Sequence, residues 1–326
     1  MKLKVVDILN SWKSILAGRA PALSIEITKE CPLSCPGCYA YGGEHLGGEV
    51  LLNQVSDYKG QVLIDRFMDV IDHHEPLHVS IVGGEPLVRF RELTEILPRL
   101  NARGIRTHLV TSAVRPIPIE WAKYQNVTII VSIDGLAAEH DVRRKPATYE
   151  RILKNIERHR ITVHSTVTRQ MTERPGYLRE FLDFWCGRPE IEKIWFSLFT
   201  PQVGESSYEI LPPGARAQVV GELLELRNLF PKLDMTKVTI EGFLTPPSSP
   251  DECVFAKTTR TITADLKTRI TPCQFGGNPD CSQCGCIASA GLNAIARAKL
   301  PGGMRVGWLY EQSIQVGNVV AAMRGD

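Results

Sequence analysis

Short apolar runs alternate with longer amphipathic segments over the first two thirds of the chain, and this alternation restricts the fold more than any other feature. The apolar runs predict strands at residues 23–28, 78–82, 105–110, 127–133, 161–168 and 191–199. Helical spacing predicts helices at residues 60–73, 89–103, 118–124, 147–160 and 177–186. Such alternation is typical of a parallel sheet covered by helices. Six units are too few for a closed eightfold barrel, so we expect an α/β fold with a partial (β/α)6 TIM-like barrel.

The rest of the chain is organised differently. We expect an N-terminal amphipathic helix within residues 1–20, the barrel within 21–205, and a small extension within 206–326. The extension is predicted to contain helical segments and a hairpin, at residues 212–230, 260–272, 287–299 and 308–323. The Pro- and Ser-rich stretch 245–250 is a break in composition that is typical of a linker.

The composition excludes several classes of protein. Hydrophobic residues make up 43% of the chain and charged residues 23%, which is ordinary for a globular protein. The formal net charge of +2 gives no argument for bulk nucleic-acid binding. No apolar run reaches membrane-spanning length, and the first residues lack a signal-peptide cleavage pattern. We therefore expect a cytoplasmic protein without a transmembrane segment.

Nine cysteines are distributed in two clusters. Three lie within eight residues, Cys31, Cys35 and Cys38, and five lie in a late block between Cys253 and Cys286. In a chain of this size, clustered cysteines indicate metal or redox chemistry rather than structural disulfides. Only Cys186 stands alone, and its apolar neighbours predict a buried thiol.

The first cluster of cysteines directly follows the first predicted strand. A loop with this spacing can wrap three thiolates around one face of an inorganic cluster, which leaves one iron without a protein ligand. A small molecule can then coordinate the open iron. Structural zinc would normally require a fourth ligand, which His45 could supply.

With three cysteines in a CxxxCxxC pattern, the chain resembles the radical S-adenosylmethionine superfamily over roughly residues 20–200. The resemblance implies a [4Fe–4S] cluster on these catalytic cysteines, with S-adenosylmethionine bound at its open iron. The segment Ile81–Pro86 is similar to the GGEP element of the family, whose backbone meets the amino group of the cofactor. This assigns cofactor contacts to Gly83, Gly84 and Glu85, and glycine permits such close approach because it lacks Cβ.

The same resemblance assigns further contacts. The segment Val131–Gly135 is similar to the SxDG element of members that carry an extra iron–sulfur domain, which implies that Ser132 and Asp134 lie near the carboxylate or ribose of the cofactor. Arg144 is a candidate partner for the carboxylate, because guanidinium makes bidentate contacts, and an exposed Arg144 is the alternative. Thr166, near the end of the fifth predicted strand, is a further candidate contact to the cofactor.

One argument is independent of the family. All of these elements lie at the carboxyl ends of predicted strands, which is the edge where parallel α/β sheets place their sites. One departure from the family is Gly37, where many relatives have an aromatic residue before the third cysteine. We expect Tyr39 to pack against the adenine in its place.

The late cysteines resemble those of the SPASM and Twitch extensions, which bind auxiliary iron–sulfur clusters. Five cysteines are one more than a single cubane needs. The resemblance implies a Twitch-like iron–sulfur extension with one second [4Fe–4S] cluster on Cys253, Cys273, Cys281 and Cys284, with Cys286 as the spare thiol. Cys286 in place of Cys281 is an alternative, and a zinc knuckle also suits this spacing.

The resemblance implies that a flavodoxin or ferredoxin reduces the first cluster, which cleaves S-adenosylmethionine to methionine and a 5′-deoxyadenosyl radical. The radical then modifies an unidentified substrate, for which a peptide, a small metabolite and a lipid all remain candidates. A non-catalytic electron carrier or redox sensor is the alternative function. A carrier, however, has no need of the cofactor-shaped elements at residues 83–86 and 132–135.

Overall fold

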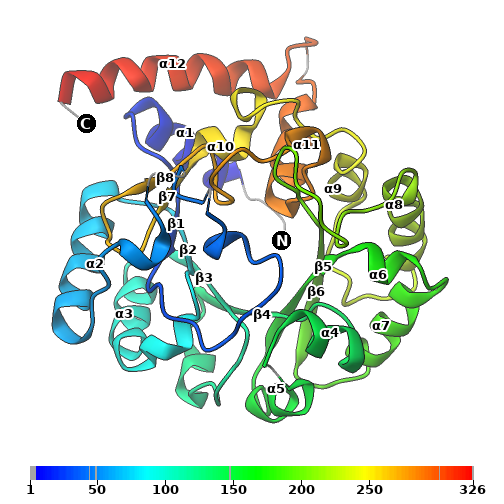
Figure 1. The fold of residues 1–326 in the computed structure, drawn as a ribbon. Helices are drawn as coiled ribbons and strands as arrows, with labels where there is room; N and C mark the ends of the chain where they lie inside the picture. The colour runs from blue at the N-terminus through cyan, green and yellow to red at the C-terminus, as the bar shows by residue number, and fades with distance from the viewer. Residues whose placement is uncertain (1–4, 44, 48–49, 147, 301, 325–326) are drawn as a thin grey trace.

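A computed structural model describes residues 5–324 apart from 44, 48–49, 147 and 301, with residues 5–8 and 324 described by their backbone alone. Eight strands form one sheet in the order β6-β5-β4-β3-β2-β1-β7-β8 (Figure 1). They are β1 Ala22–Glu26, β2 His78–Val82, β3 Arg106–Thr111, β4 Val127–Ser132, β5 Ile161–Val167, β6 Ile191–Leu198, β7 Thr259–Ile262 and β8 Arg269–Ile270. The strands β1 to β6 pair in parallel, which confirms the predicted partial barrel.

The hairpin predicted at residues 260–272 forms and extends this sheet. Strand β7 pairs in parallel with β1, and β8 returns antiparallel to β7. Residues of the predicted extension therefore belong to the same sheet as the barrel. The boundary at residue 205 stays a prediction.

Helices cover the outer face of the sheet (Figure 1). Those between the barrel strands are α2 Gly60–His74, α3 Phe90–Ala102, α4 Ala137–Arg143, α5 Tyr149–Asn155, α6 Arg169–Thr172 and α7 Tyr177–Cys186. The helix predicted at 147–160 is shorter than expected, because Arg158 adopts a φ of +66° and turns the chain toward β5. The helix predicted at 118–124 is a 3₁₀ turn, and α4 was not predicted.

Apolar side chains between the helices and the sheet form the core. Leu63, Phe67 and Ile71 recur along one face of α2 and are fully buried against the sheet. Burying one such side chain contributes about 1.5–3 kcal/mol, so these periodic positions fix the helix on the sheet. Cys186, at the end of α7, is only partly buried against this core.

The C-terminal helices are α8 Ala215–Leu226, α9 Lys237–Gly242, α10 Val254–Thr258, α11 Ile287–Arg297 and α12 Val306–Arg324. The N-terminal helix α1, Val5–Leu16, packs against α12 (Figure 1), while residues 1–4 of that predicted segment lie outside the described residues. The predicted linker is anchored, since Arg297 donates hydrogen bonds to Thr245 and Pro247 is buried. Among the described residues, no helix is long and apolar enough to cross a membrane.

Candidate active site

A cavity of about 470 Å³ lies at the carboxyl ends of the barrel strands. It brings together most of the site residues predicted for the first cluster and the cofactor, namely Cys35, Cys38, Tyr39, Gly83, Gly84, Glu85, Ser132, Asp134, Arg144 and Thr166. Cys31 belongs to the same loop but does not line the cavity. The late cysteines predicted as ligands line a second pocket.

The thiols of the first loop are partly buried. The backbone N–H of Leu33 donates to Cys31 Sγ at 3.4 Å. Burial raises the pKa of Cys31 to about 11, and burial likewise raises the pKa of Cys35. These thiols are therefore neutral at pH 7 in the metal-free chain, and iron binding would release their protons.

The glycine segment after β2 packs directly on the chain that leads into the cysteine loop. The Gly84 N–H donates to the Thr28 carbonyl at 2.8 Å, and the Glu85 N–H donates to the Glu30 carbonyl at 2.9 Å. A Cβ on Gly84 would lie 2.3 Å from the Glu30 carbonyl oxygen, and Gly83 adopts a φ of +131°. The glycines are therefore required for this backbone contact, whatever they contribute to cofactor binding.

The carboxylate of Glu85 is buried and joins the ends of β2 and β3. It accepts hydrogen bonds from the Leu87 N–H at 2.9 Å, from the Ser112 N–H at 2.7 Å and from the Thr111 hydroxyl. Burial raises its pKa, and these donors oppose that effect. The sequence had suggested no role for Thr111 and Ser112, yet both help to fix the wall of the cavity.

Asp134 and Arg144 form a buried ion pair at the end of β4. Arg144 Nε donates to Asp134 Oδ2 at 2.6 Å, and its Nη1 donates to the Ser112 hydroxyl at 2.9 Å. The other carboxylate oxygen accepts from the Thr166 N–H at 2.9 Å. Arg144 is therefore not a free surface residue, and its guanidinium borders the cavity where a carboxylate of a ligand can be bound.

A second arginine, missed in the sequence, extends this pair into a network. Arg143 also donates to Asp134, and its Nε donates to Glu209 Oε1 at 2.6 Å. Glu209 in turn lies against the cysteine loop, since a Cβ on Gly37 would be 2.9 Å from its carboxylate. The only local signal was the pair of arginines at the end of α4, because Glu209 lies 66 residues away.

We expect Arg143→Gln to destabilise the fold most above about pH 4 and least in strong acid, where the carboxylate of Asp134 is protonated in both variants. Burial alone would raise the pKa of Asp134, but Arg143 and Arg144 outweigh it and hold that pKa well below its usual range. The ionised carboxylate therefore stabilises the fold fully above about pH 4, and this contribution is lost as the pH falls further. Losing one partner of the buried network should cost about 3 kcal/mol and move acid unfolding to higher pH. Urea unfolding at several pH values measures this, with exposed Lys154→Gln as a control, and equal stability of both variants would contradict it.

His45 forms hydrogen bonds with Glu26 and Phe275 rather than with the thiols of the first loop. Its Nε2 lies 2.9 Å from Glu26 Oε1, and its Nδ1 lies 3.0 Å from the Phe275 carbonyl oxygen. Both partners are acceptors, so the protonated ring can donate a hydrogen bond to each of them. Burial opposes this charge, while the bond to Glu26 raises the pKa of His45. His45 therefore joins the first loop to the extension and is no free fourth ligand for zinc.

The floor of the cavity is lined by neutral polar rings. The His108 ring lies edge-on against the His78 ring, with 4.5 Å between the ring centroids. It is tilted against the Trp195 ring, with 5.7 Å between the centroids. His164 Nε2 lies 2.8 Å from the Ser197 hydroxyl. Burial lowers the pKa of His108 and of His164 to about 4, so both are uncharged at pH 7. The signal in the sequence for these residues was their alternating inward positions on β3, β5 and β6.

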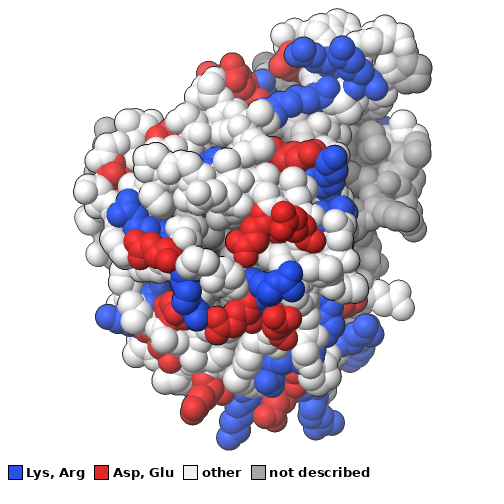
Figure 2. Space-filling view, turned by 90° about the vertical axis from the view of Figure 1, so that its right-hand side faces the viewer, with Lys and Arg blue, Asp and Glu red and all other residues white. Residues whose placement is uncertain are grey.

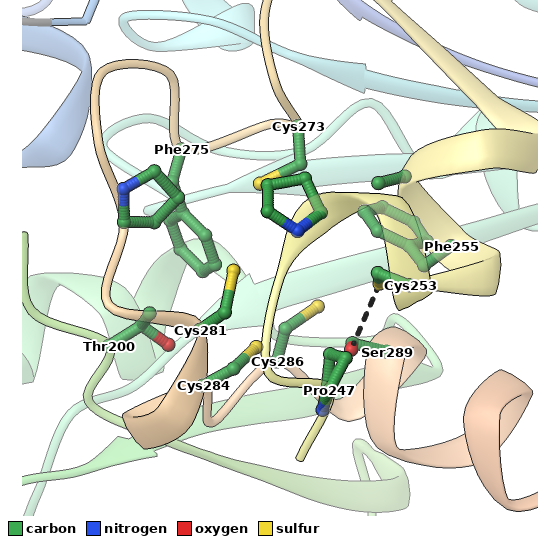
Figure 3. A pocket seen from close by; sticks show the side chains of 13 residues that line it. Thr200, Pro247, Cys253, Phe255, Cys273, Phe275, Cys281, Cys284, Cys286 and Ser289 are labelled. Carbon is green, nitrogen blue, oxygen red and sulfur yellow. Dashed lines mark hydrogen bonds between the residues drawn. The ribbon is translucent and has the colours of Figure 1, made fainter.

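All five late cysteines line one pocket between β6, α10 and α11 (Figure 3). Figure 3 shows Cys281, Cys284 and Cys286 close together. Cys253 forms a hydrogen bond with Ser289, with 3.3 Å between Sγ and Oγ. Burial raises the pKa of Cys273 to about 12 and that of Cys281 to about 11. Cys286 also borders the first cavity and therefore lies between the two sites.

Among the described residues, no three His, Cys, Asp or Glu side chains converge on a point where a single metal ion would fit. Zinc needs its sulfur ligands at about 2.3 Å from one centre. In a [4Fe–4S] cubane each thiolate binds a different iron, so its ligands do not converge on one point.

The fold and the cavity define an α/β protein of the partial-barrel class, with a thiol-rich site at the carboxyl edge of its parallel strands. Residues 25–173 of the chain match the Radical SAM superfamily.

Two curated relatives match parts of the chain. A 7-carboxy-7-deazaguanine synthase from Hyperthermus butylicus is 31% identical over 108 residues, which are 31% of this chain and 39% of that protein. A PqqA peptide cyclase from Xanthomonas campestris pv. campestris is 26% identical over 184 residues, which are 52% of this chain and 46% of that protein. The chain thus spans less than half the length of these two relatives.

Two solved structures share the fold. SuiB from Streptococcus suis, bound to S-adenosylmethionine, has a TM-score of 0.54 at 17% identity and covers 79% of this chain and 60% of its own. Native anSMEcpe with bound AdoMet has a TM-score of 0.55 at 15% identity and covers 93% of this chain and 97% of its own. The fold likeness to anSMEcpe therefore extends through the C-terminal part of this chain.

Proposed function

We propose that the chain is an enzyme that reductively cleaves S-adenosylmethionine and uses the resulting radical to modify an organic substrate. The observation that carries this proposal is the convergence on one cavity of the cysteine loop, the glycine segment and the Asp134–Arg144 pair. A [4Fe–4S] cluster on Cys31, Cys35 and Cys38 would supply the electron that breaks the sulfonium bond.

The remaining residues bind and orient. The glycine segment fixes the backbone beside the thiols, and Ser132 offers a hydroxyl at the cavity wall. Arg144, oriented by Asp134 and Ser112, would bind the carboxylate of the cofactor. Tyr39, which packs edge-on against Phe275 at 5.4 Å between ring centroids, would close the adenine side. Such fixed orientation is how an enzyme directs a radical at one bond.

A peptide is the substrate class we favour. The neutral floor at His108, His164 and Trp195 can hydrogen-bond and stack with an uncharged group. SuiB binds the precursor peptide SuiA in one solved structure, anSMEcpe binds the Cp18Cys peptide in another, and one curated relative is a PqqA peptide cyclase. A small metabolite or a lipid would have to make the same hydrogen-bonding and stacking contacts with these three rings.

The pocket lined by the late cysteines is proposed to hold a second [4Fe–4S] cluster, on Cys253, Cys273, Cys281 and Cys284. Their thiols line one buried pocket, and none of these four lines the cofactor cavity. A flavodoxin or ferredoxin is the proposed reductant.

We expect anaerobically reconstituted protein to bind about eight iron atoms, as two cubanes, and to convert S-adenosylmethionine to 5′-deoxyadenosine with dithionite. Iron analysis and chromatography of the products measure both quantities. A reduced, iron-loaded protein that leaves S-adenosylmethionine intact would be an electron carrier or redox sensor instead. Stoichiometric zinc with negligible iron would rule out both functions.

A further inference from the structure

An open cleft of about 430 Å³ is lined by residues of α2 and of the β7–β8 hairpin. None of its lining residues lines the cofactor cavity. Its cationic side chains outnumber its single carboxylate, Asp69, and are Arg66, Arg260, Lys267 and Arg269. Val70, Ile262 and Leu266 add an apolar floor.

Two of the arginines in this cleft lie beside ring side chains. The Arg66 guanidinium lies over the Tyr58 ring at 4.5 Å, and Arg260 Nη1 lies 3.4 Å from His74 Nδ1. Within the described part of the chain, no carboxylate pairs with Arg66, Lys267 or Arg269. By contrast, acidic and basic side chains are intermixed on the face shown in Figure 2.

The hairpin that borders the cleft also contacts the first cysteine loop. Ala264, in the turn after β7, is fully buried with Ala40 and Val55, and Cys38 packs against the same small apolar group. The Thr263 hydroxyl donates to Glu26 at the end of β1, at 2.7 Å. The turn between β7 and β8 therefore lines the cleft through Leu266 and contacts the loop of Cys38 through Ala264.

We propose that this cleft is the docking surface of an acidic protein that delivers the electron to the first cluster. This inference rests on the proposed function, which needs one electron from outside for each cleavage. One electron leaves the reduced flavin of the donor and one enters the cluster on Cys31, Cys35 and Cys38, with no bond formed or broken. A cationic cleft of this kind speeds the encounter with an acidic partner, and its apolar floor supplies contact area.

The test reverses two charges that touch neither cluster nor cofactor. Lys267→Glu with Arg269→Glu is compared with Lys154→Glu with Arg160→Glu, which makes the same charge change near the amino ends of the barrel strands. Reduced flavodoxin is the donor, and dithionite is the small reductant. We expect the cleft variant to bind flavodoxin about tenfold or more weakly at low ionic strength, and to lose a similar factor in flavodoxin-driven cleavage. Dithionite-driven cleavage should stay at the wild-type rate, and the control should behave as wild type.

Unchanged flavodoxin binding and unchanged flavodoxin-driven cleavage in the cleft variant would overturn the proposal. Tight binding of inorganic pyrophosphate that the cleft variant loses, with donor binding intact, would overturn it in favour of a small-anion site. Failure of the proposed function is distinguishable, because wild-type protein would then give no 5′-deoxyadenosine even with dithionite. The binding constants are measured independently of any turnover.

Discussion

Gly84→Ala is expected to abolish 5′-deoxyadenosine formation and to remove about half of the iron. The new Cβ would lie 2.3 Å from the Glu30 carbonyl oxygen and 2.7 Å from its carbonyl carbon, and both atoms belong to backbone rather than to a flexible side chain. The chain must move, and the hydrogen bond from the Glu85 N–H to Glu30 must break. Because Cys31 follows Glu30 directly, the displacement reaches the cluster loop.

The matched control is Gly221→Ala in α8, where a Cβ meets no atom within 4 Å. This change should keep iron and cleavage, and it should stabilise the helix by about 0.5–1 kcal/mol. Iron analysis and product chromatography on both variants measure the difference. Full iron with lost cleavage in Gly84→Ala would mean that this glycine serves the cofactor alone. Full iron with full cleavage would show that the GGEP assignment is wrong.

Cys284→Ala is expected to lower the iron content from about eight to about four atoms. The first site uses none of the late cysteines, so cleavage of S-adenosylmethionine without substrate should persist in this variant. Turnover of the true substrate should fall much further, because a cluster on these thiols would tie the start of α10 to the loop before α11. Iron content, absorption spectra and cleavage with dithionite separate these effects.

Cys286→Ala is the informative partner of that variant. As the spare thiol it should leave the iron near eight atoms, even though it borders both cavities and accepts a hydrogen bond from Gln274 at 3.4 Å. Cys186→Ala, on α7, serves as a thiol control far from both pockets in the sequence. Loss of the second cluster in Cys286→Ala but not in Cys281→Ala would exchange the two residues in the ligand set. Unaltered iron in every late variant would mean that the block holds no cluster.

The local patterns of the sequence predicted the strands of the barrel and the edge at which the site lies. Strands β1 to β6 and helix α7 follow their predicted positions because apolar periodicity reports directly which face of each element is buried. Residues at the carboxyl ends of parallel strands must meet at one edge, so the sequence alone could group Cys35, Gly84, Ser132 and Thr166 in one cavity.

Only the tertiary structure decided the contacts between segments that are distant along the chain. No local pattern indicated that Gly84 abuts Glu30, that Glu209 joins Arg143, or that His45 bridges Glu26 and Phe275. Nor did it indicate that β7 pairs with β1, which places a cationic cleft beside the loop of Cys38. Such contacts depend on sheet register and on the path of each loop, and the composition of a segment does not encode which distant backbone will lie against it.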